Sequence, residues 1–190
     1  MPVLVSMLRG VNVGPHNRIK MDALRALYVS LKLEDPRTYV QSGNVIFRIK
    51  DLRNGGNSTA QLARKIQDAI ARKFGFRPDV ILRTPDELRR VLAANPFGGR
   101  KNLDCTKVLV TFLASEPSAE ARARVLALKP GPEELHLIGR ELYIYFPNGA
   151  GQSKLQWSSV DKKLENSGTA RNLNSVARML EIAEQMESAE

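Results

Sequence analysis

Two polar stretches near the start of the chain carry residue types that could bind a ligand. Arg9 and Asn12 stand in the first stretch, directly after an apolar run, and Gln41, Ser42 and Asn44 stand in the second. Guanidinium and carboxamide groups can hydrogen-bond a phosphate or the edge of a nucleobase. The same residue types also satisfy the backbone of turns, so turn formation is the competing interpretation.

The elements around these stretches predict that the two meet. Residues 3–8 read as a buried strand, Met21 to Leu31 as a helix, and residues 39–40 and 45–49 as two strands joined at Gly43. A loop over 52–57, a second helix capped by Ser58 and a strand at 80–82 complete the order strand, helix, strand, strand, helix, strand. This is the ferredoxin-like unit, in which the first and third strands are antiparallel neighbours. The two polar stretches should therefore share one edge of the sheet.

The second half of the chain predicts a similar order without residue-level self-similarity. Residues 108–113 read as a strand, followed by a helix, a hairpin of 135–138 and 142–146, and another helix, with no clear fourth strand. We expect an α+β protein with two ferredoxin-like lobes, 1–96 and 105–190, joined by a linker over 97–104. The lobes would be βαββαβ, then βαββα plus a C-terminal helix, with antiparallel sheets and helices on one face.

Two further segments could hold an anion. Residues 168–172 are expected to open the last helix, where free N–H groups and the cation of Arg171 favour a phosphate, with Asn172 alongside. Ordinary capping by Thr169 is the alternative. Lys154 follows a Gly-rich connection and could touch a phosphate, although the segment lacks the spacing of a nucleotide-triphosphatase loop. We expect Arg9, Asn44 and Arg171 to converge on one anion-binding cleft.

Charge is distributed unevenly along the chain. Residues 1–104 hold 19 Lys/Arg and 9 Asp/Glu, whereas residues 105–190 hold 10 and 11. A basic half indicates an anionic partner, although excess charge can also serve solubility. The segment 45–49 has one aromatic residue and lacks the RNA-recognition pattern. No apolar run is long enough to span a membrane, and His16, His136 and Cys105 form no ligand cluster, so we expect a cytoplasmic protein without metal or cofactor.

Several segments, taken together and in this order, resemble the bacterial family known as domain of unknown function 1697. They are Arg9-Gly10-Val11-Asn12-Val13-Gly14, Met21 with Leu24-Arg25-Ala26-Leu27, Thr38-Tyr39-Val40-Gln41-Ser42-Gly43-Asn44-Val45, Ala94-Asn95-Pro96-Phe97, Gly149 and Gly151 before Ser153-Lys154-Leu155, and Gly168-Thr169-Ala170-Arg171-Asn172. The resemblance implies two ferredoxin-like lobes and a bacterial cytosolic protein. It implies no activity.

The functional expectation is a cleft that binds a phosphate-bearing small molecule, either a nucleotide or a sugar phosphate. The alternatives are nucleic-acid binding through the basic N-terminal half and a non-catalytic interaction protein, and the sequence leaves both the reaction and the oligomeric state open. The candidate ligand-binding residues are Arg9, Asn12, Gln41, Ser42, Asn44, Lys154, Arg171 and Asn172.

Overall fold

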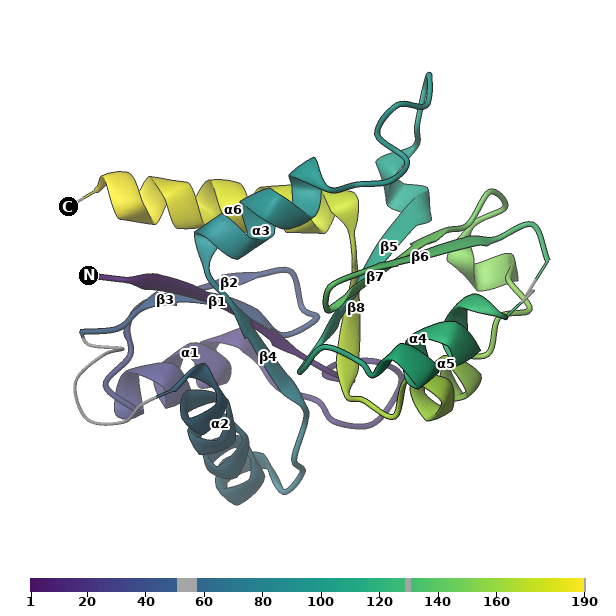
Figure 1. The fold of residues 1–190 in the computed structure, drawn as a ribbon. Coiled ribbons are helices and arrows are strands. Elements are labelled where there is room, and N and C mark those ends of the chain that lie inside the picture. Colours follow the sequence, from purple (N-terminus) through teal and green to yellow (C-terminus); the bar gives the residue numbers. More distant parts are fainter. Residues whose placement is uncertain (51–57, 129–130, 190) are drawn as a thin grey trace. The chain divides into compact units, whose positions relative to one another are not determined.

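A computed structural model describes residues 1–50, 58–128 and 131–189, so the loop expected over 52–57 lies outside the described residues. The expected α+β class is confirmed, because the chain forms two four-stranded antiparallel sheets with helices (Figure 1). It divides into two compact units. Unit 1 is 1–89 together with 178–190, and unit 2 is 90–177.

Unit 1 contains the sheet of order β2-β3-β1-β4. The predicted pairing of the first and third strands is confirmed, with Val5 opposite Ile46. The second strand is longer than expected and includes Pro36, which an edge strand tolerates because its N–H side needs no partner in the sheet. The elements are β1 (Val3–Leu8), α1 (Met21–Ser30), β2 (Glu34–Tyr39), β3 (Asn44–Arg48), α2 (Thr59–Phe74), β4 (Val80–Arg83) and the start of α3 (Pro85–Ala93).

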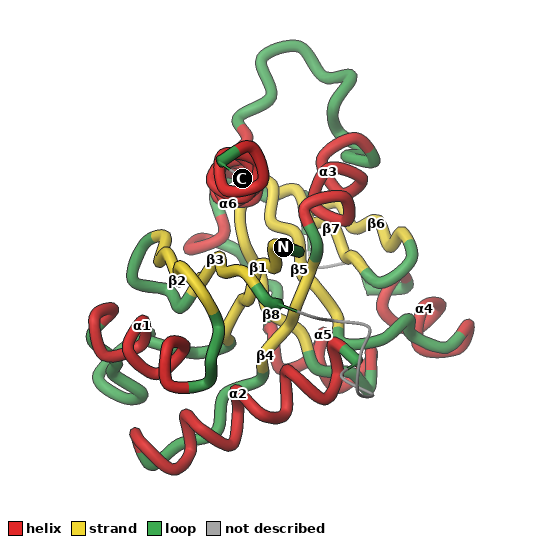
Figure 2. Tube along the Cα trace, turned by 90° about the vertical axis from the view of Figure 1, so that its left-hand side faces the viewer, coloured by secondary structure: helices red, strands yellow, loops and turns green. Residues whose placement is uncertain are grey.

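One face of this sheet is covered by α1 and α2, which lie on the same side of it in both views (Figures 1 and 2). Leu4, Leu8 and Phe47 on the strands join Leu24 of α1 and Ile66 of α2 in one core. All five side chains are fully buried. The helical spacing of apolar residues therefore places both helices as the sequence predicts.

The opposite face of the same sheet is also buried, so the expectation of helices on one face is wrong for unit 1. Val3, Val5 and Met7 point away from the α1–α2 core, and none is exposed. The end of α6 (Leu173–Ser188) lies against this face, where Arg48 Nη2 donates to the main-chain oxygen of Met186. A strand buried on both faces is nearly continuously apolar, and β1 is interrupted only by Ser6.

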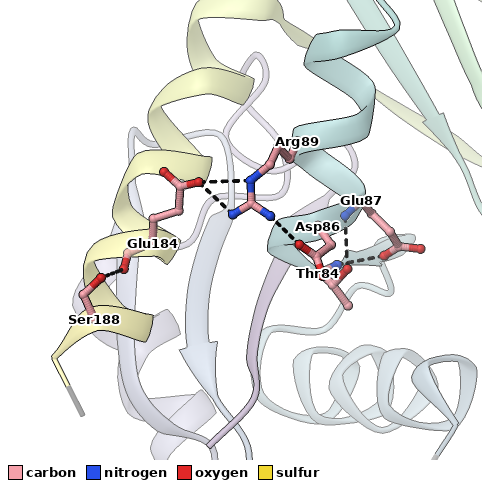
Figure 3. Close-up of polar contacts among 6 residues, drawn as sticks. All are labelled: Thr84, Asp86, Glu87, Arg89, Glu184 and Ser188. Atoms are coloured by element: carbon pink, nitrogen blue, oxygen red, sulfur yellow. Dashed lines mark hydrogen bonds and ion pairs between the residues drawn. The ribbon is translucent and has the colours of Figure 1, made fainter.

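The start of α3 and the end of α6 are joined through Arg89 and Glu184. Arg89 donates to Glu184 Oε1 from Nη2 at 2.8 Å and from Nε at 3.3 Å, and it also bonds Asp86 (Figure 3). The helix α3 begins at a capping box between Thr84 and Glu87. These contacts attach the C-terminal residues of the chain to unit 1.

Unit 2 contains the sheet of order β6-β7-β5-β8. Its core joins Leu113 and Leu142 of the sheet to Val125 and Val160 of two helices. The elements are β5 (Val108–Leu113), α4 (Ala119–Leu126), β6 (Glu134–Ile138), β7 (Glu141–Tyr145), α5 (Trp157–Leu164) and β8 (Gly168–Asn172), with 3-10 turns at Cys105–Lys107 and Ala150–Gln152.

The strand β8 corrects two expectations, that unit 2 lacks a fourth strand and that 168–172 open a helix. Arg171 lies opposite Val110 in the antiparallel pair of β8 with β5. The helix α6 instead begins at Leu173, and Asn172 Oδ1 caps it by accepting from the Ser175 N–H at 2.8 Å. The sequence of β8 is short, polar and opens with Gly168, so it gives no alternation that would indicate a strand.

The unit boundaries differ from the expected domains and linker. Phe97, at the start of the expected linker, is buried in unit 2, with its ring centroid 5.3 Å from that of His136 and 5.6 Å from that of Tyr145. Arg100 lies over the rings of Phe97 and Tyr145, at 4.9 and 4.8 Å from their centroids, and bonds Glu134 at 2.6 Å. This part of the segment is therefore packed onto the second sheet.

The central strands of the two sheets are similar in sequence, which corrects the expectation of no residue-level self-similarity. β1 reads VLVSML and β5 reads VLVTFL. Val5 pairs with Arg83 in the first sheet, and Val110 pairs with Arg171 at the equivalent position in the second. Six residues are too few to stand out in a chain of this length until the strand order aligns them.

Candidate functional site

The ends of β1 and β3 meet at Gly43, as the sequence predicts. The Leu8 N–H donates to the Gly43 oxygen at 3.0 Å. Gly43 has φ of +77°, and a Cβ there would stand 3.0 Å from Leu8 Cβ and 3.2 Å from Val11 Cβ. A glycine is therefore needed here both for its backbone conformation and for the close approach of β1.

Asn12 connects the loop after β1 to the turn before β3. Its Nδ2 donates to the Ile19 oxygen at 2.9 Å and to the Gln41 oxygen at 2.7 Å, and its Oδ1 accepts from the Ile19 N–H at 2.8 Å. Both amide hydrogens and the amide oxygen are thus engaged by the backbone. The turn interpretation therefore holds for the Asn12 side chain, whose contacts position neighbouring groups.

Asn44 also serves the turn rather than an open site. Its side chain is fully buried, and Nδ2 donates to the Tyr39 oxygen at 3.1 Å and to Ser42 Oγ at 3.0 Å. These bonds hold the connection between β2 and β3. Asn44 and Ser42 are brought together as predicted, but as parts of the same turn.

Arg9 extends from the end of β1 toward the start of β4. Its Nη1 lies 3.9 Å from Asp79 Oδ2, and the side chains are 38% and 39% exposed. The backbone N–H of Arg9 donates to the Asp79 oxygen at 2.9 Å. Arg9 therefore already has an acidic neighbour in this structure.

A pocket of about 580 Å³ opens beside Asn12 and Gln41. Arg18 and Lys20, which the sequence analysis did not select, contribute exposed cations to it. The first turn of α1 begins here, and no side chain caps it. Two cations just before an uncapped helix start were the signal that could have indicated this site. The lining residues are Asn12, Arg18, Ile19, Lys20, Met21, Asp22 and Gln41.

Asp22 brings one negative charge to the pocket lining, and that charge is paired. Its carboxylate accepts a hydrogen bond from Arg25 Nη2, one turn further along α1. Arg25 Nη1 also donates to Thr38 Oγ1 at 2.6 Å, so its guanidinium is held in place. With Asp22 neutralised by Arg25, Arg18 and Lys20 leave the lining with a net positive charge.

The predicted residues of unit 2 occupy different surroundings. Arg171 is buried on β8, where its Nη1 donates to Thr169 Oγ1 and to the Ala170 oxygen, each at 2.8 Å. Burial lowers the pKa of Arg171 to about 10. Asn172 is the cap of α6, and Lys154 is exposed in the loop before α5. Arg171 belongs to unit 2 while Arg9 and Asn44 belong to unit 1, so their convergence stays a prediction.

The described residues contain neither a cluster of metal ligands nor a membrane-spanning helix. In that part of the chain, no three His, Cys, Asp or Glu side chains gather where they could hold a metal ion. No helix within the described ranges is long and apolar enough to cross a membrane.

Fold and site together define the class, an α+β protein of two four-stranded antiparallel sheets with a cationic pocket at the start of α1. The chain belongs to the family described as protein of unknown function DUF1697, whose model matches residues 1–143. This confirms the resemblance noted in the sequence.

A solved structure has the same fold. The conserved bacterial protein SP0830 from Streptococcus pneumoniae is similar with a TM-score of 0.69 and 22% sequence identity, over 96% of this chain and 98% of that chain. At this identity the likeness establishes the fold alone. No curated protein matches the chain.

Proposed function

We propose that the pocket beside Asn12 and Gln41 binds a phosphate-bearing small molecule, such as a nucleotide or a sugar phosphate. The observation that carries the proposal is that Arg18 and Lys20 line the same pocket as the uncapped first turn of α1. The N-terminal N–H groups of a helix and its dipole favour an anion, and two cations add to this attraction.

The other lining residues fit the organic part of such a ligand. Ile19 and Met21 offer apolar surface, and the exposed amide of Gln41 can donate to or accept from a ligand. Asn12 acts as a positioning residue, because it holds Ile19 and Gln41 through their backbones. Of the residues predicted from sequence, Asn12 and Gln41 therefore belong to the proposed site.

The test is a thermal-shift and calorimetric screen of inorganic phosphate, nucleotides and sugar phosphates. A ligand that binds only the folded state raises the melting temperature, and the rise grows with the logarithm of the ligand concentration divided by Kd. Arg18→Gln with Lys20→Gln should abolish the shift produced by the best ligand. The control removes the same charge from exposed lysines of unit 2, by Lys101→Gln with Lys162→Gln, and should keep the shift. Equal loss in both variants, or no shift with any compound, would contradict the proposal.

We also propose that each sheet with its two intervening helices is a ferredoxin-like lobe, and that the protein is cytosolic. The strand orders β2-β3-β1-β4 and β6-β7-β5-β8 support the first statement, since each places the first and third strands of its unit side by side. A lone cysteine in the sequence supports the second. An experimental structure with another strand order, or recovery of the protein outside the cytosolic fraction, would contradict them.

A further inference from the structure

The helix α2 has a strongly basic outer face. Leu62, Ile66 and Ile70 occupy its inner face and are buried in the core of unit 1. Its one acidic residue, Asp68, is bonded to Arg77, which follows the helix. The remaining charged residues of α2 are all cations and all exposed, and they are Arg64, Lys65, Arg72 and Lys73.

These cations differ from most arginines of the chain in their surroundings. Elsewhere, many guanidinium groups form ion pairs with carboxylates, as in Arg37–Asp35, Arg100–Glu134 and Arg124–Glu165. Within the described ranges, no carboxylate forms an ion pair with any of the four cations of α2. Lys73 Nζ instead lies 5.6 Å from the centroid of the Phe74 ring. Asp68 stands between Arg64 and Arg72 along the helix, but its carboxylate is bonded to Arg77. The four cations therefore leave an excess of positive charge on α2, which an anion lying against the helix would offset.

We propose that this face of α2 binds the phosphodiester backbone of a nucleic acid. The cations form two pairs separated by eight residues, which is about 12 Å along a helix at 1.5 Å per residue. That length corresponds to three to four phosphates of one strand, at about 3.4 Å per nucleotide of duplex. Contacts to phosphates carry no sequence information, so the binding is independent of sequence.

A membrane surface fits this helix less well than a nucleic acid. Helices that bind membranes insert an apolar face among the lipids. The apolar face of α2 is already used by the core of unit 1. The large apolar side chains that are exposed on the described residues all lie outside α2, and they are Met1, Val13, Val29, Val40, Leu126 and Ile138.

The experiment measures the affinity for fluorescent single-stranded DNA, single-stranded RNA and duplex DNA of about 20 nucleotides, by anisotropy between 50 and 200 mM KCl. Each phosphate contact adds about −0.9 to the slope of log K against log salt for duplex, and about −0.7 for a single strand. Arg64→Gln with Lys65→Gln and Arg72→Gln should therefore flatten the duplex slope by about 2.7 and weaken binding at least tenfold. The three oligonucleotides show which form of nucleic acid binds more tightly.

The matched control removes three charges from unit 2 at exposed or half-buried lysines, by Lys101→Gln with Lys162→Gln and Lys163→Gln. It has the same net charge as the α2 variant and should retain both affinity and slope. The pocket variant Arg18→Gln with Lys20→Gln should also retain nucleic-acid binding, so failure of one proposal is separable from failure of the other. The proposal is overturned if no oligonucleotide binds at 50 mM KCl, if the control loses as much affinity as the α2 variant, or if phosphatidylserine vesicles bind and oligonucleotides do not.

Discussion

Asn12 Nδ2 donates a hydrogen bond of 2.7 Å to the main-chain oxygen of Gln41, a residue 29 positions further along the chain. The same carboxamide exchanges two hydrogen bonds with the backbone of Ile19. One side chain thus fixes two walls of the proposed pocket, one just before α1 and one just after β2 in the sequence. The pocket depends on a residue that has no free polar group to offer a ligand.

Replacing Asn12 should destabilise the protein and weaken the binding of phosphate compounds together. Asn12→Gly removes three hydrogen bonds and should cost about 1–3 kcal/mol in urea unfolding. Asn12→Ala should cost about 1 kcal/mol more, because Asn12 has φ of +57° and alanine is strained there. Gln41→Ala should leave stability unchanged, since only its backbone oxygen accepts from Asn12. Equal stability of the Gly and Ala variants would show that the loop relaxes to another conformation.

Gly43→Ala should destabilise unit 1 for two reasons that a control can separate. Alanine at φ of +77° is strained by about 1–2 kcal/mol, and its methyl would also press on Leu8 and Val11. Gly14→Ala has a similar φ of +67° with no atom within 4 Å of the added methyl, so it reports the strain alone. We expect the melting temperature to fall further for Gly43→Ala than for Gly14→Ala. Equal decreases in melting temperature for the two variants would mean that β1 moves to accommodate the added methyl group without loss of stability.

Ser6 and Tyr28 should be energetically coupled. Their hydroxyl oxygens lie 2.7 Å apart in the core of unit 1, and both residues are fully buried. Tyr28→Phe or Ser6→Ala alone leaves one buried hydroxyl without this partner and should cost about 1–3 kcal/mol. The double variant should cost less than the sum of the two, as measured by denaturant unfolding of all four proteins. Strict additivity would indicate that water replaces the missing partner.

Glu134 should make stability depend on pH in the acid range. The hydrogen bond from Arg100 holds the pKa of Glu134 below its ordinary value of 4.5. The unfolded chain therefore binds the proton first, so this stabilisation is present above pH 4.5 and disappears as the pH falls through the lowered pKa. We expect Glu134→Gln to melt below the wild type at neutral pH and to match it in acid.

The control for this pH dependence is Glu187→Gln, which removes the same charge from an exposed residue near the end of α6. Its melting temperature relative to the wild type should not change with pH in the manner of Glu134→Gln. If the two variants behave alike, the effect reflects net charge and not the Arg100 contact.

Features that depend on a few adjacent residues, such as strands, helices and helix caps, can be predicted from the sequence. The nearly continuous apolar run of β1 indicates a strand buried on both faces. The helical spacing from Leu62 to Ile70 indicates α2, and Ser58 with Gln61 indicates its capping box. The order of these elements predicts that β1 lies beside β3 and that Asn12 and Gln41 are close, and the structure has both. Backbone preferences and burial patterns depend on residues that are adjacent in the chain, so they can be predicted without the tertiary structure.

Other features were decided by contacts between distant segments. The strand β8 has no apolar alternation, and it is a strand because β5 offers an unpaired edge to Gly168–Asn172. Phe97 reads as part of a polar linker until His136 and Tyr145 surround it. Arg18 and Lys20 are candidate ligand-binding residues because they line one pocket with the first turn of α1 and with Gln41, and this arrangement exists only in the tertiary structure. These hydrogen-bond partners and pocket walls come from residues far apart in the chain. Whether such residues meet depends on the free energy of the whole fold, so a local sequence pattern does not predict it.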